Sequence, residues 1–228
     1  MNDLKDLKQL ENKIGYKFKS LTILEEALTH SSYANEKHHG SVCNERLEFL
    51  GDSVLGLISA EYYFKLFAAK PEGDLTKMRA ASVCEESLFG FAKRISLGDY
   101  LFLGRGEEHT GGRERPSILA DAFEAVIAAI YLDGGFEKAK EFVLPFLLNP
   151  PEKDERFKDY KTTLQEIIQQ NPEERLEYVL TGEEGPDHDK HFFVEVRLNS
   201  NVIGKGQGRS KKHAEQQAAK EALELMGF

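Results

Sequence analysis

The chain has 228 residues, of which 40% are hydrophobic and 30% charged, and its formal net charge at pH 7 is −9. This composition is typical of a globular protein, and the longest apolar run, residues 125–132, is too short to span a membrane. The only cysteines, Cys43 and Cys84, lack a CxxC spacing, which argues against a disulfide scaffold or a soft-metal site. The polar N-terminus lacks the features of a secretory signal, so we expect a cytoplasmic protein that does not associate with a membrane. The net negative charge, taken alone, argues against a polyanionic partner.

The first part of the chain, residues 1–148, is predicted to be a helical bundle. Apolar residues recur at helical spacing, Ser20 is a plausible N-cap, and Pro116 suits the first turn of a helix that ends before Gly134. The predicted helices cover residues 4–10, 21–28, 44–67, 81–95, 116–133 and 137–148. No alternating pattern that would indicate a strand is found there.

The polar residues 149–157, which include Pro150 and Pro151, have the composition of an interdomain linker. The hydrophobic period changes after them. We expect a helix, three strands and a final helix over residues 159–170, 175–181, 191–199, 202–206 and 210–226. The fold class is therefore multidomain, an all-α bundle over 1–148 followed by a small α+β module (α-β-β-β-α) over 158–228.

Two pairs of carboxylates are placed on otherwise apolar helices. Glu48 and Asp52 are four residues apart, and Asp121 and Glu124 are three apart, so each pair shares one helix face. If the two helices pack face to face, four negative charges gather in a small space, which requires a cation. A ligand set made only of oxygens suits Mg²⁺, for which Mn²⁺ can substitute, and does not suit zinc.

Three segments that contain these acids resemble the motifs of the ribonuclease III family. They are NERLEFLGDSVL at 44–55, EGDLTKMR at 72–79 and SILADAFEA at 117–125, in the expected order and at the expected distances. The resemblance extends over nearly the whole chain. It implies that Glu48, Asp52, Asp121 and Glu124 bind metal, and that Asp52 and Glu124 are the active-site pair.

The same resemblance implies further features. The position of Phe49 matches an aromatic residue that inserts into a pocket of a second subunit, so it implies a homodimer. Glu45, Glu72 and Asp74 also fall in matching motifs, without a defined role. The implied activity is endonucleolytic cleavage of double-stranded RNA, with 5′-phosphate and 3′-hydroxyl ends and short 3′ overhangs. Two magnesium ions about 4 Å apart could activate water and stabilise the departing 3′ oxygen. Ribosomal RNA precursors and structured mRNAs are the implied substrates.

The C-terminal module resembles the double-stranded RNA-binding domain, which reads the shape of a duplex through 2′-hydroxyls and phosphates. By this resemblance Gln165, in the first helix, and His188, in the loop between the first two strands, reach into minor grooves. Lys211 and Lys212 begin the last helix, where backbone N–H groups and the helix dipole favour phosphate. Residues 157–228 contain ten basic and thirteen acidic residues, so Lys190 and these two lysines must be concentrated locally for RNA to bind.

Other classes of protein remain to be weighed. A non-catalytic, regulatory protein that binds double-stranded RNA would keep this fold, but the presence of all four acids argues against it. A di-metal helical oxidoreductase would need Glu-x-x-His pairs, which neither acidic segment provides. The glycine-rich turn over 204–210 departs from the nucleotide-binding P-loop, because Arg209 stands where lysine is required, so we expect no nucleotide cofactor.

Overall fold

The structure is a computed structural model that describes residues 3–37, 42–150, 159–169, 171, 173–186 and 190–227. The chain divides into two compact units, residues 1–154 and 155–228. Each is described by itself. Because residues 151–158 lie outside the described part, the linker predicted over 149–157 stays a prediction.

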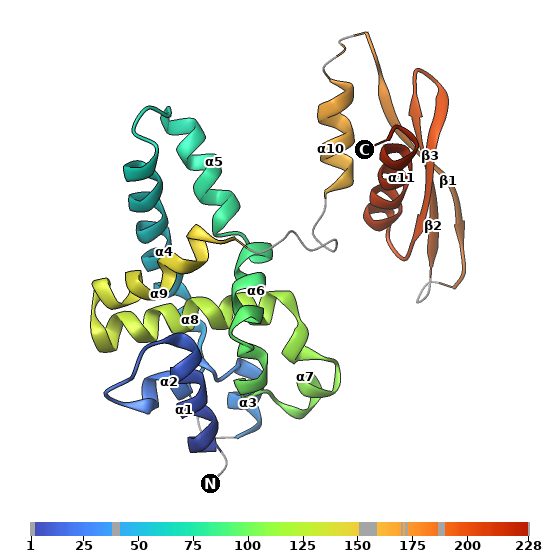
Figure 1. The fold of residues 1–228 in the computed structure, drawn as a ribbon. Helices are drawn as coiled ribbons and strands as arrows, with labels where there is room; N and C mark the ends of the chain where they lie inside the picture. Colours follow the sequence, from blue (N-terminus) through green and yellow to red (C-terminus); the bar gives the residue numbers. More distant parts are fainter. Residues whose placement is uncertain are drawn as a thin grey trace. The chain divides into compact units, whose positions relative to one another are not determined.

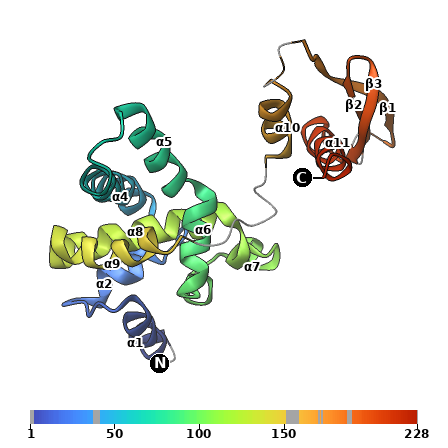
Figure 2. The same ribbon diagram turned by 45° about the horizontal axis from the view of Figure 1, so that its top comes forward.

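The first unit is helical (Figures 1 and 2). Its helices are α1 (Asp3–Ile14), α2 (Leu21–Ala27), α3 (Ser31–Glu36), α4 (Glu45–Leu66), α5 (Glu72–Ser82), α6 (Glu85–Arg94), α7 (Arg105–His109), α8 (Pro116–Gly134) and α9 (Phe136–Leu148), with short 3-10 turns at Leu97–Tyr100 and Gly112–Glu114. In the described part of the chain, no helix is long and apolar enough to cross a membrane.

The centre of this unit is α8, which packs against α2, α4, α6 and α9. From Ile118 to Ile130 every residue of α8 except Asp121 is buried. Four aromatic rings, from Phe91, Phe123, Phe142 and Phe146, join α6, α8 and α9, with centroids of neighbouring rings 5.2–5.7 Å apart. Burial of α8 on nearly all sides fixes the two acids that it carries.

The predicted helix over 81–95 is wrong at its start. Two helices occupy this region, because α5 ends at Ser82, and α6 begins only after Cys84, whose backbone is extended (φ −74°, ψ 160°). The helix α5 was missed because it buries no residue, so it has no apolar stripe to recognise. The other expected elements of this unit are confirmed with shifted ends.

The second unit contains α10 (Tyr160–Ile168), β1 (Leu176–Glu184), β2 (His191–Leu198), β3 (Asn201–Gly208) and α11 (Lys211–Leu225). The strands form an antiparallel sheet in the order β1-β2-β3, and α11 packs on β2 and β3 with α10 alongside (Figure 1). A Cβ on Gly206 would overlap the carbonyl of Ala214, so glycine in β3 and alanine in α11 allow close packing. The predicted α-β-β-β-α order, and with it the fold class, is confirmed.

Candidate active site and RNA-binding surface

The candidate active site lies where α4 crosses α8. Gly51 is buried at this crossing, and a Cβ there would overlap the backbone carbonyl of Glu124. Since Gly51 lies between Glu48 and Asp52, the lack of a side chain brings the acidic turn of α4 directly against the acidic turn of α8. The position therefore requires glycine for close approach.

The crossing brings together three of the four predicted acids. One carboxylate oxygen each from Glu48, Asp121 and Glu124 lies within 4.8 Å of the other two. Glu124 is only 9% exposed. Asp52 is exposed and lies outside this trio, although its negative charge acts on both Glu48 and Glu124.

The metal-free carboxylates are electrostatically strained. Burial, followed by the charges of Asp52, Glu48 and Asp121, raises the pKa of Glu124 to about 8. Burial and neighbouring acids, Asp121 first, also raise the pKa of Glu48. Close, poorly hydrated carboxylates favour protonation unless a cation neutralises them. Their oxygens are the hard donors that Mg²⁺ and Mn²⁺ prefer, so the residues fit a divalent ion of this kind.

One acid near the site was not singled out from the sequence. Glu85, in the first turn of α6, adds to burial in raising the pKa of Asp121. It is distant from the acidic motifs in sequence and carries no local signal, so only the packing of α6 on α8 could reveal it. Glu45 acts in the same sense on Glu48.

The other two motif acids lie on α5. Glu72 and Asp74 occupy its first turn, and the Glu72 carboxylate accepts a hydrogen bond of 2.8 Å from the Thr76 hydroxyl. Glu72 also lines an apolar groove between α4 and α5. Neither residue belongs to the carboxylate trio, and their roles stay undefined.

The raised pKa of Glu124 predicts a pH-dependent stability. Between its ordinary pKa of 4.5 and about 8, the folded protein binds a proton that the unfolded chain has released, so stability falls as pH rises. In EDTA, we expect the unfolding free energy to fall by on the order of a few kcal/mol between about pH 5 and pH 8. Urea titrations at several pH values measure this change. Saturating Mn²⁺ or the Glu124→Gln substitution should flatten the curve, and a metal-free stability that rises over this range would contradict the assignment.

Phe49 lies on α4 beside the acids and points to solvent, with 77% of its surface exposed. Leu57 and Phe64, one turn after another along the same helix, are 59% and 72% exposed. An apolar surface of this kind on a soluble domain is typical of a protein interface.

The predicted RNA-binding residues lie on three parts of the second unit. Gln165 is exposed on α10. Lys211 and Lys212 begin α11, whose N-cap Ser210 accepts a 3.2 Å hydrogen bond from the backbone of His213. Lys190 precedes β2, while His188 lies outside the described residues.

Two of these lysines share an acidic neighbour. The Glu183 carboxylate lies 3.5 Å from the Lys211 ammonium and 3.8 Å from that of Lys190. The charge of Lys212 helps to lower the pKa of Asp159, after the hydrogen bonds that Gln216 and Thr162 donate to that carboxylate. The local concentration of positive charge expected from the sequence is thus partly offset by acids.

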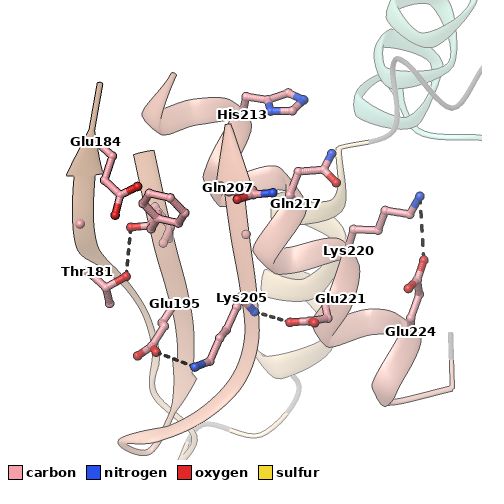
Figure 3. Close-up of a pocket in the computed structure, with 14 residues that line it drawn as sticks. Thr181, Glu184, Glu195, Lys205, Gln207, His213, Gln217, Lys220, Glu221 and Glu224 are labelled. Carbon is pink, nitrogen blue, oxygen red and sulfur yellow. Dashed lines mark hydrogen bonds and ion pairs between the residues drawn. The ribbon is translucent and has the colours of Figure 1, made fainter. Parts of the chain in front are cut away.

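A groove of about 990 Å³ between the sheet and α11 has the opposite character (Figure 3). Lys205 forms an ion pair with Glu195, its backbone N–H donates to Glu221, and Lys220 lies close to Glu224 (Figure 3). Four glutamates and two lysines line this groove, so it does not favour phosphate.

A helical unit with clustered carboxylates, followed by an α-β-β-β-α module with a basic helix N-terminus, defines a nuclease joined to a domain that binds double-stranded RNA. Family profiles agree: residues 20–150 match "Ribonuclease-III-like" and residues 160–226 match "Double-stranded RNA binding motif". The chain belongs to the ribonuclease III family. It is therefore an endoribonuclease specific for double-stranded RNA, and the resemblance found in the sequence motifs is confirmed.

Relatives match over almost their full length. A Ribonuclease 3 from Clostridium tetani is 54% identical over 229 residues, which cover 99% of this chain and 97% of the relative. One from Caldanaerobacter subterraneus is 50% identical, covering 97% of this chain and 99% of the relative. The solved nuclease domain of ribonuclease III from Campylobacter jejuni is 48% identical, with a TM-score of 0.58, and covers 62% of this chain and 95% of that domain. In that protein a region involved in dimer formation is structurally flexible.

Proposed function

We propose that the chain is a magnesium-dependent endoribonuclease that works as a cytoplasmic homodimer and cuts both strands of an RNA duplex. In this proposal residues 1–148 carry the catalysis, 149–157 form a linker and 158–228 hold the duplex. The products have 5′-phosphate and 3′-hydroxyl ends with short 3′ overhangs. Precursors of ribosomal RNA and structured mRNAs are the proposed substrates.

The observation that carries the proposal is the close grouping of Glu48, Asp121 and Glu124 at a helix crossing. These three and the neighbouring Asp52 would hold the metal, with Asp52 and Glu124 as the catalytic pair. When bound, magnesium supplies an activated water and stabilises negative charge on the departing 3′ oxygen. The protein's part is to fix its carboxylates in a poorly hydrated site and to bring the duplex backbone to them.

Incubation with a long, perfectly paired RNA tests this function, with and without magnesium, followed by mapping of the fragment ends. We expect magnesium-dependent cleavage of both strands with the ends given above. Binding without any cleavage at millimolar Mg²⁺ or Mn²⁺ would favour a regulatory RNA-binding protein instead. Mn²⁺ should replace Mg²⁺, because both accept carboxylate oxygens.

The exposed apolar surface of α4 supports the dimer. Removing the ring in Phe49→Ala is expected to weaken dimerisation by about 30-fold or more, because burial of a Phe side chain contributes about 2–3 kcal/mol. Sedimentation velocity over a concentration series measures the change. Leu132→Ala, at a 53% exposed position on α8, is the matched control and should leave the dimer intact. Equal dimer stability in both variants would remove Phe49 from the interface.

A further inference from the structure

Glu183 is placed to oppose RNA at the surface where the two lysines lie. It is the penultimate residue of β1, and its two carboxylate oxygens face different cations, Oε1 toward Lys211 and Oε2 toward Lys190. The Glu183 side chain is 40% exposed, as the lysine side chains also are in part. All three groups are therefore accessible to a ligand.

The surroundings hold Lys211 near this carboxylate. Glu183 is paired with Phe192 across the β1–β2 ladder, so both side chains project from the same face of the sheet. The Lys211 ammonium lies 5.7 Å from the centre of the Phe192 ring, within the range of a cation–π contact. Glu183 thus lies between the start of α11 and the residue that precedes β2.

We propose that Glu183 is a specificity-determining residue that limits the attraction of this surface for phosphate. This inference rests on the proposed role of Lys190 and Lys211 in binding RNA. A phosphate in contact with either ammonium lies close to the Glu183 carboxylate, and the two negative charges repel each other. Exposed ion pairs are weak, so RNA can displace the carboxylate, but the repulsion persists in the complex.

The consequence is selectivity for the shape of the duplex. Phosphate attraction is common to all nucleic acids, whereas contacts with 2′-hydroxyls in the minor groove belong to RNA. By weakening the common part of the interaction, Glu183 makes binding depend more on the RNA-specific part. It also favours faster dissociation, since a weaker interaction of the same surface mainly shortens the lifetime of the complex.

Affinity measurements on the full-length protein in EDTA, which prevents cleavage, test this proposal. Glu183→Gln keeps the shape and removes the charge. We expect it to bind a short RNA duplex on the order of threefold more tightly at 0.1 M salt. The plot of log K against log[salt] should become steeper, by up to about 0.9, if one more phosphate is neutralised. Affinity for a DNA duplex of the same length should rise by at least as much, which lowers the preference for RNA.

Glu177→Gln is the matched control, because Glu177 is exposed on the same strand and the same charge is removed. It should change neither the affinity nor the salt slope. Unchanged or weaker RNA binding by Glu183→Gln would overturn the proposal; weaker binding would mean that Glu183 positions the lysines.

Lys211→Gln separates this inference from the proposed function. If that substitution weakens RNA binding while Glu183→Gln has no effect, the RNA-binding role of α11 stands and the role of Glu183 fails. If Lys211→Gln leaves the affinity unchanged, the proposed RNA-binding surface itself is wrong. Thermal melting of each variant checks that the second unit remains folded.

Discussion

Glu124→Gln is expected to reduce RNA cleavage by on the order of 10³-fold or more, because metal ligation contributes several kcal/mol to stabilisation of the transition state. Glu124 is 9% exposed and belongs to the trio of carboxylates, and glutamine cannot supply the same negative charge to a cation. Single-turnover cleavage of an RNA duplex at saturating Mg²⁺ measures the loss. The affinity for the same duplex in EDTA should stay within about twofold, since the contacts of the second unit are untouched.

Glu137→Gln, at an exposed position on α9, provides the control and should cleave at the normal rate. The fold of Glu124→Gln should be at least as stable as the wild type in EDTA at pH 8, because a buried charge has been removed. Normal turnover by a folded Glu124→Gln protein would refute the assignment of Glu124 as a ligand.

Reversing Lys211 and Lys212 to Glu is the second large change, and it should weaken duplex binding by on the order of 10²-fold at 0.1 M salt. Each lost phosphate contact removes about 0.9 from the slope of log K against log[salt], so two contacts account for a change of about 1.8. The loss should be equal for duplexes of different sequence, because phosphate contacts carry no sequence information. Fluorescence anisotropy over a range of salt concentrations measures both quantities.

Reversing Lys205 and Lys220, which line the groove of Figure 3, changes the charge by the same amount. This double variant should lose much less affinity, because acids already outnumber lysines there. Equal losses in the two double variants would show that net charge alone governs binding. The N-terminal turn of α11 would then have no special role.

The helical bundle, the later α+β module and the acids on each helix could be predicted from local patterns. A helix places Glu48 with Asp52, and Asp121 with Glu124, whatever its neighbours are. Alternating apolar residues indicated the strand that became β2, which packs one face on α11. The helix α5 escaped prediction for the same reason, since it buries no residue and its sequence shows no period.

The sequence by itself determined the fold class, the family and the set of acids that could bind metal, because these depend on residue type and on spacing within single elements. Only the tertiary structure decided which acids meet. Gly51 allows α4 to approach the backbone of Glu124 closely, which groups Glu48 with Asp121 and Glu124 and leaves Asp52 at the edge. Tertiary packing also brought Glu85 toward Asp121, and Glu183 between Lys190 and Lys211. Such contacts join elements far apart in the chain, and no local spacing encodes their distance.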